Sequence, residues 1–129
     1  MSQQAAPVPH AERRALLIDV GHDTAALLAL WLGAGGFRVL AGAEAESEVG
    51  APPALVFAES AYPRRGEERR LAQIRRRWPG APVILLSPTL FPNVPARGEV
   101  ARMLGVAAAL ATPLTQARLM QTIAEVLGS

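Results

Sequence analysis

Residues 54–87, ALVFAESAYPRRGEERRLAQIRRRWPGAPVILLS, contain two short apolar runs on either side of a charged segment with a helical period. The runs 54–58 and 82–87 have the length and continuous apolar character of strands buried on both faces. Between them, apolar residues recur at helical spacing, at Leu71, Ile74 and Trp78. This spacing predicts a helix over 66–78 with its arginines turned outward. A strand, a helix and a second strand in this order predict a parallel βαβ unit.

The same alternation continues on both sides of this unit. Three further apolar runs are expected to be strands: 15–20, 37–40 and 106–111. Four further helices are expected, at 23–33, briefly at 44–49, at 97–105 after a proline-interrupted loop, and at 115–127. Asp23 or Thr24 is the expected N-cap of the helix at 23–33. Five strands alternating with five helices predict a doubly wound α/β sheet, whose ligands bind at the carboxyl ends of the strands.

The composition is that of one globular domain. The chain has 129 residues, of which 50% are hydrophobic and 19% charged, enough to bury a core of its own. No apolar run approaches the roughly 18 residues that a membrane span needs, so no membrane association is expected. We expect residues 1–13 to be a disordered lead and residues 14–129 to form the domain. The absence of cysteine fits a reducing compartment, and a cytoplasmic location is the expectation.

Polar residues follow the ends of four predicted strands. They are Asp19, Glu59, Ser87 and the dipeptide Thr112-Pro113. Their order and spacing, together with residues 105–114, GVAAALATPL, resemble the response-regulator receiver (CheY-like) family, whose corresponding segment has the pattern GA..YL.KPF. The resemblance covers residues 14–128. It implies a flavodoxin-like (βα)5 fold with strand order 2-1-3-4-5, a role in two-component signal transduction or a phosphorelay, and a cis peptide bond before the proline.

The phosphotransfer chemistry of that family needs groups that this chain has partly lost. Receivers hold Mg²⁺ with an acidic pair after strand one and with the acceptor aspartate, and a lysine after strand five pairs with the phosphoryl oxygens. Carried over to this sequence, the acidic pair falls on Asp19 and Val20. The acceptor falls on Glu59, the lysine on Thr112, and the hydroxyl after strand four is kept as Ser87. Because all 13 basic residues are arginines, no shift of the alignment restores the lysine.

These substitutions predict an atypical member, a pseudo-receiver, with no catalytic residues and no enzymatic activity. It would act by protein–protein interaction without phosphorylation on aspartate. No cofactor is expected, although Asp19 and Glu59 are candidates for weak Mg²⁺ binding. Glu59 is either a solvated carboxylate with no role or a fixed charge that imitates phosphate in an active-like state, which needs contact with Ser87 or an arginine. The alternative function is a small-ligand or nucleotide-binding protein, or a small enzyme, that uses Asp19, Glu59 and Ser87 in the strand-end crevice.

Two surfaces are candidates for partners. The helix at 23–33 has no charged residue after Asp23, so its outer face is either harmlessly covered by alanines or contacts another protein. A homodimer through this helix and the last one would use Leu30 and Trp31 as anchors. The arginine-rich segment 64–77 is expected to be a solvated helix face, with an acidic protein or nucleic acid as the alternative. A net charge of only +2 and the lack of interleaved aromatic residues argue against nucleic acid for this domain alone.

Overall fold

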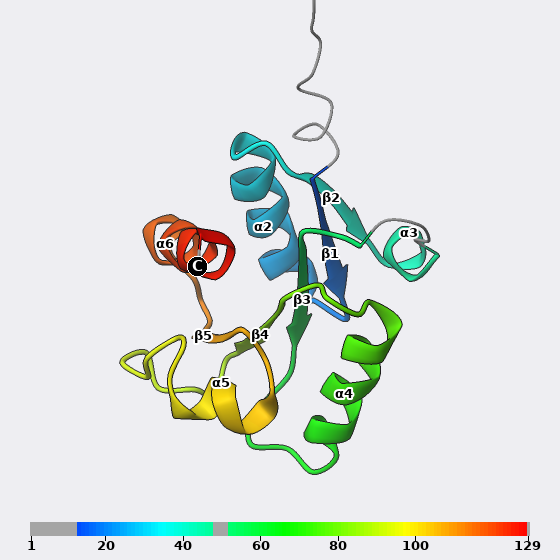
Figure 1. The fold of residues 1–129 in the computed structure, drawn as a ribbon. Coiled ribbons are helices and arrows are strands. Elements are labelled where there is room, and N and C mark those ends of the chain that lie inside the picture. Colours follow the sequence, from blue (N-terminus) through cyan, green and yellow to red (C-terminus); the bar gives the residue numbers. More distant parts are fainter. Residues whose placement is uncertain (1–12, 48–51, 129) are drawn as a thin grey trace, which may run out of the picture.

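The computed structural model describes residues 13–47 and 52–128, so nearly all of the expected N-terminal lead lies outside the described residues. Five parallel strands form one sheet of order β2-β1-β3-β4-β5, which confirms the predicted doubly wound topology (Figure 1). The strands are β1 (Arg14–Ile18), β2 (Arg38–Ala41), β3 (Leu55–Glu59), β4 (Val83–Ser87) and β5 (Ala108–Ala111).

Helices cover both faces of the sheet. On one face lie α2 (His22–Ala34) and α6 (Gln116–Gly128), and on the other lie α3 (Ala43–Glu46), α4 (Glu67–Arg77) and α5 (Glu99–Leu104) (Figure 1). Each expected helix is present within a few residues of its predicted bounds. The third helix, α3, is a single turn, and residues 48 and 49 of its predicted range lie outside the described part of the chain. No helix in the described segments is long and apolar enough to cross a membrane.

Apart from polar residues at their ends, the central strands β1, β3 and β4 are apolar, because a helical layer covers each face of the sheet. Successive side chains of a strand point to opposite faces, so Leu16 and Val56 enter the core beneath α3, α4 and α5. Leu17 and Phe57 enter the second core, beneath α2 and α6. All of these side chains are at most 2% exposed. This packing fixes the register of the parallel strands and thereby the position of every strand end.

The start of α2 differs from the expectation. Gly21 is the N-cap, and neither Asp23 nor Thr24 makes a side-chain capping hydrogen bond. The main-chain N–H of Gly21 instead donates to Glu59 Oε1 at 2.7 Å. Asp19 has a φ of 56°, in the left-handed region, which ends β1 at Ile18. The helix begins at His22, one residue earlier than predicted. A tertiary hydrogen bond therefore replaces the local cap that the sequence suggests.

Candidate functional site

The parallel register brings the predicted site residues to one edge of the sheet. Cα pairing joins Ile18 to Ala58 and Glu59 to Leu86, so the ends of β1, β3 and β4 lie side by side. The main-chain N–H of Thr112 donates to Ser87 O at 3.0 Å, which places the start of the β5–α6 loop beside β4. The peptide bond before Pro113 is cis, as the resemblance implies, and so is Tyr62-Pro63, which was not expected.

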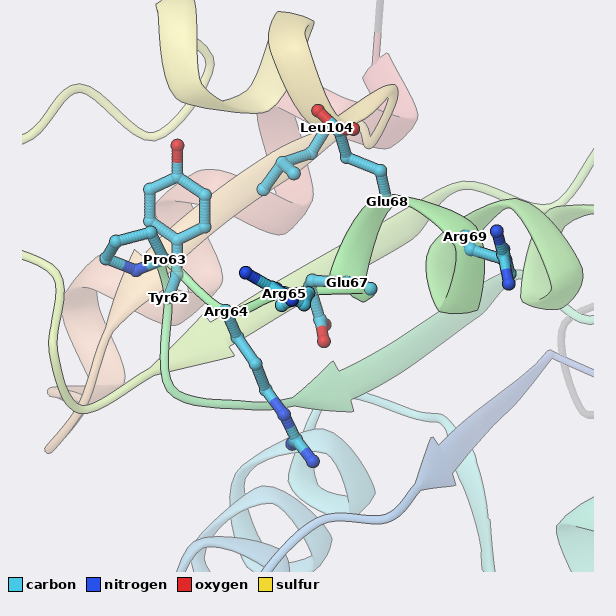
Figure 2. A pocket seen from close by; sticks show the side chains of 9 residues that line it. Tyr62, Pro63, Arg64, Arg65, Glu67, Glu68, Arg69 and Leu104 are labelled. Carbon is cyan, nitrogen blue, oxygen red and sulfur yellow. The ribbon is translucent and has the colours of Figure 1, made fainter.

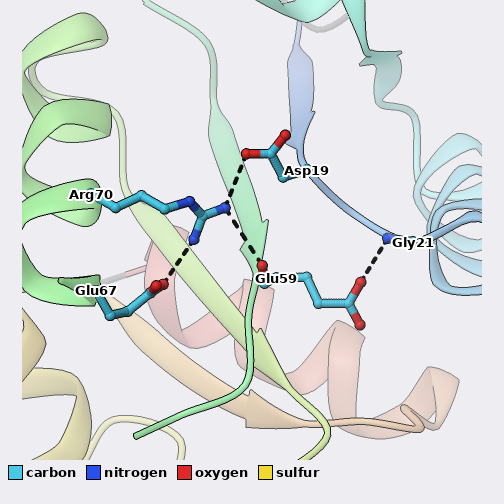
Figure 3. A network of polar contacts seen from close by, with 5 residues as sticks. All are labelled: Asp19, Gly21, Glu59, Glu67 and Arg70. Carbon is cyan, nitrogen blue, oxygen red and sulfur yellow. Dashed lines mark hydrogen bonds and ion pairs between the residues drawn. The ribbon is translucent and has the colours of Figure 1, made fainter. Parts of the chain in front are cut away.

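Asp19 faces a guanidinium group from α4. The left-handed conformation of Asp19, which aspartate tolerates better than most residues, turns its carboxylate out of the sheet. The side chain is 72% exposed, and its Oδ2 lies 3.4 Å from Arg70 Nη2 (Figure 3). An ion pair this exposed contributes little stability, but it puts a positive charge at the one carboxylate kept from the acidic pair.

Arg70 is held in place by two further contacts. Its Nη1 donates to Glu67 Oε2 at 2.8 Å, and its Nη2 lies 3.5 Å from the main-chain oxygen of Glu59 (Figure 3). The side chain of Glu67 is only 2% exposed, and a buried carboxylate needs a paired cation. Arg70 is therefore anchored on its buried side and reaches Asp19 on its exposed side. One fixed positive charge lies between the ends of β1 and β3.

The carboxylate of Glu59 points away from this charge. Its Oε1 accepts the hydrogen bond from Gly21 N, and Figure 3 shows the side chain directed toward the β1–α2 loop, opposite to Arg70. The carboxylate packs closely against Gly21, because a Cβ on this glycine would lie 3.3 Å from the same oxygen. Within the described residues the carboxylate has no hydrogen bond to Ser87 and no ion pair with an arginine. A phosphate-like role for Glu59 requires one of these contacts.

The Ser87 hydroxyl is fully buried and bonded within the protein. Its Oγ accepts from the main-chain N–H of Tyr62 at 3.0 Å and lies 2.9 Å from Thr89 Oγ1. Thr89 Oγ1 donates to Tyr62 O, so the Ser87 hydroxyl donates its proton to Thr89. This network ties the loop after β3 to the end of β4. The Ser87 hydroxyl therefore positions a loop. The side chains of Asp19, Glu59 and Ser87, which the ligand-binding alternative would use together, do not converge on a common point.

The side chains that would hold Mg²⁺ do not fit that ion. Val20 is apolar and half-buried against the core, Asp19 faces Arg70, and Glu59 faces Gly21. Across residues 13–47 and 52–128, no three histidine, cysteine, aspartate or glutamate side chains lie close enough together to hold a metal ion. Mg²⁺ demands near-octahedral oxygen coordination, which this donor set does not provide.

Sequence reasoning assigned Arg70 and Glu67 only to the charged segment 64–77 and did not name Tyr62 or Thr89, although all four build the site. The expectation of a solvated helix face at 64–77 holds for most of its arginines, which are exposed, but not for Arg70 or for Arg75, whose Nη1 donates to Leu104 O at 3.0 Å. The spacing of Glu67 and Arg70, three residues apart at a helix start, does indicate an ion pair. No local pattern signals the contact between Arg70 and Asp19, which are 51 residues apart.

The outer face of α2 is apolar and partly exposed. Leu30 is 66% exposed and Leu27 37%. Trp31, the second predicted anchor, is half-buried and packs against the core shared with α6. Met120 of α6 approaches Gly35, because a Cβ on that glycine would lie 3.1 Å from Met120 Cε. The available apolar surface is therefore centred on Leu27 and Leu30.

Comparison with known proteins places the fold. No family model matches the sequence, and no curated protein matches it. Among solved structures, the chain is similar to a response regulator from Thermotoga maritima, with a TM-score of 0.68 and 16% identity over 92% of this chain and 99% of that one. The chemotaxis protein CheY4 of Vibrio cholerae gives 0.68 and 17% identity over 90% and 99%. A two-component response regulator from Clostridium difficile gives 0.68 and 18% identity over 91% and 97%.

At these low identities the similarity concerns the backbone alone, yet it extends over nearly the whole of each protein. The sheet order agrees with the order that the strand-end residues implied. This chain has the fold of a response-regulator receiver domain.

Proposed function

We propose that this chain is a signalling module of the receiver fold that acts through protein–protein contacts and is not phosphorylated on an acidic side chain. The observation that carries the proposal is the position of Arg70. Its guanidinium lies 3.4 Å from Asp19 Oδ2 and 3.5 Å from the main-chain oxygen of Glu59. It supplies a positive charge of the protein's own at the strand ends, where a receiver would bring in a metal ion.

The remaining groups of the site support the same proposal. Val20 and Thr112 stand where receivers carry a carboxylate and a lysine, so a transferred phosphoryl group would lack two of its electrostatic partners. A divalent ion that approaches Asp19 would be repelled by the Arg70 guanidinium, which Glu67 holds in place, and would have to displace it in order to bind. Glu59 acts in this proposal as a brace for the β1–α2 loop through Gly21, in place of an acceptor or a phosphate mimic.

Metal binding is the first requirement of receiver phosphotransfer and tests the proposal. The thermal midpoint of the wild type should not change when millimolar Mg²⁺ replaces EDTA at constant ionic strength. A ligand that binds the native state raises the midpoint, so a saturable rise in the wild type would overturn the proposal. Arg70→Gln should gain a weak Mg²⁺ response because it frees Asp19. Arg69→Gln is the matched control and should behave as wild type, because the exposed Arg69 side chain makes no hydrogen bond or ion pair with the described residues.

The partner surface we propose for self-association is the face of α2 and α6. Beyond Asp23, α2 carries no charge, so the α2 part of this face can meet its copy around a twofold axis without repulsion between like charges. Leu27 and Leu30 supply its exposed apolar contacts. Such a face suits a homodimer or the docking of a second signalling protein, and the oligomeric state distinguishes the two.

A further inference from the structure

The arginines of 64–77 divide into two groups. In the first group the guanidinium has a partner. Arg70 pairs with Asp19 and Glu67, and Arg75 donates to Leu104 O. Arg77 donates to Glu46 O and lies over the Trp78 ring. A second group has exposed side chains that make no hydrogen bond or ion pair with the described residues: Arg64, Arg65, Arg69 and Arg76. Three members of this group, Arg64, Arg65 and Arg69, lie together around one cavity, and we call them the arginine trio.

The cavity lies between the β3–α4 loop, the first turn of α4 and the end of α5, and has a volume of about 710 Å³ (Figure 2). Tyr62 and Pro63 form one apolar side and Leu104 another. Figure 2 shows the three arginine side chains pointing in different directions, with Arg64 and Arg69 extending away from Leu104 and from each other. Separated positive charges beside the apolar sides of a cavity suit an extended peptide. A single small anion would need donors that converge on one point.

The loop that carries Arg64 and Arg65 is fixed by its main chain. Tyr62 is held through both its N–H and its carbonyl by Ser87 and Thr89. Farther along, Arg64 O accepts from Glu67 N at 3.2 Å, and Gly66 turns the chain into α4 with a φ of 83°. A loop already held in one conformation loses less conformational entropy when a partner binds. The buried Ser87 hydroxyl thereby organises a surface outside the strand-end site.

The charges around the cavity select among anionic partners. The exposed Glu68 carboxylate lies beside Leu104 in Figure 2, and it would repel a continuous phosphate backbone. Tyr62 is partly buried against the core and is the one aromatic side chain among the described residues that line the cavity, so successive bases would find no stacking platform. A peptide that alternates acidic and apolar side chains matches both the arginine trio and the apolar sides of the cavity.

We propose that this cavity is a docking site for an acidic, partly apolar segment of a partner protein, with the arginine trio as its charge contacts. The inference rests on the proposed role as a protein-binding module, because it assigns the chemistry of a partner. It is independent of whether the strand-end site binds Mg²⁺ or accepts a phosphoryl group, since none of the trio contacts Asp19 or the carboxylate of Glu59.

The test is a fluorescence anisotropy titration with a labelled peptide of repeated Glu-Glu-Leu units. The wild type should bind this peptide and should not bind the matched peptide with glutamine in place of glutamate. Replacing the trio together, Arg64→Gln, Arg65→Gln and Arg69→Gln, should weaken binding about tenfold or more, because each charged contact in a partly exposed interface contributes a few-fold. Arg76→Gln, on the same helix but outside the cavity, is the matched control and should change affinity less than about twofold.

Three outcomes would overturn the inference. They are no peptide binding by the wild type at low salt, an equal loss for Arg76→Gln, and tighter binding of a short single-stranded oligonucleotide that depends on the same trio. All four positions are exposed, so the variants should keep the wild-type thermal midpoint, which is checked first. If Mg²⁺ stabilises the wild type, the proposed loss of phosphotransfer fails, while the peptide can still bind. If the peptide does not bind, the docking site fails, while the proposed loss of phosphotransfer can still hold.

Discussion

Glu59 lies at the end of β3, where the receiver family carries its acceptor aspartate, and its side chain reaches the main chain of another loop. The bond from Gly21 N to Oε1 is 2.7 Å long, in the range of charge-assisted hydrogen bonds. Aspartate is shorter by one methylene and would not span this distance without movement of the loop. The extra length, which reads in the sequence as a defect in an acceptor, thus has a use in holding the N-terminus of α2.

Substitutions at Glu59 should separate its length from its charge. Glu59→Gln keeps an oxygen acceptor at the same reach, so we expect it to lower the free energy of unfolding by less than about 0.5 kcal/mol. Glu59→Asp and Glu59→Ala should each cost about 1 kcal/mol, the typical value of one hydrogen bond. Urea unfolding measures all three. Equal stability of Glu59→Asp and the wild type would contradict this role.

Among the elements, the junction of α5 and β5 has the closest glycine contact. Gly105 ends α5 with a φ of 72°, and a Cβ there would lie 2.9 Å from Arg75 Nη1, the atom that donates to Leu104 O. The glycine therefore satisfies two demands, the left-handed cap and the close approach of a guanidinium from α4. Gly36, after α2, satisfies only the first, because its φ is 95° and nothing lies within 4 Å of its Cβ position.

This difference predicts unequal costs for the same substitution. Gly36→Ala should lower the free energy of unfolding by about 1 kcal/mol, the cost of a left-handed alanine. Gly105→Ala should cost about 1 kcal/mol more, since Arg75 must also give up its hydrogen bond. Adding Arg75→Met to both should remove the difference between the two glycine variants. Chemical denaturation measures the cost of each glycine substitution in the wild type and in Arg75→Met. A cost of Gly105→Ala that is the same in both backgrounds would refute the packing argument.

The elements also show where sequence reasoning succeeds. β1, β3 and β4 were predictable because both of their faces are buried and their apolar runs are continuous. The α2 cap was not, because a tertiary bond from Glu59 replaces the local signal of Asp23 or Thr24. Alignment of the strand ends predicted which residues meet at the edge, but not that Arg70 faces Asp19 or that Ser87 holds Tyr62. Those contacts join side chains far apart in the chain, and periodicity carries no information about them.

At the scale of the whole molecule, the large exposed apolar side chains of the described residues lie on α2, on α5 and, at Phe91, in the loop after β4. Leu27 and Leu30 are on α2, and Met103, 58% exposed, is on α5. If α2 and α6 form a homodimer interface, a charge at Leu30 must be buried without a partner in the dimer. The same change at Met103 would stay in solvent. The two positions therefore form a matched pair for testing which surface associates.

Static light scattering should find a dimer of the wild type at high protein concentration. Leu30→Glu should be monomeric at the same concentration, and Met103→Glu should remain dimeric. A wild type that is monomeric throughout, or a dimer lost equally in both variants, would contradict self-association through α2. Docking of a different protein on this face would then be the remaining form of the proposal.

The central claim is that the receiver fold is kept while its transfer chemistry is lost. Incubation of the wild type with a small-molecule phosphodonor and Mg²⁺, followed by intact mass spectrometry, tests it most directly. We predict an unchanged mass, because Val20, Thr112 and Arg70 stand where transfer needs a carboxylate, a lysine and a metal ion. A stoichiometric gain of about 80 Da, the mass of one phosphoryl group, that is stable to acid and released by base would contradict the claim.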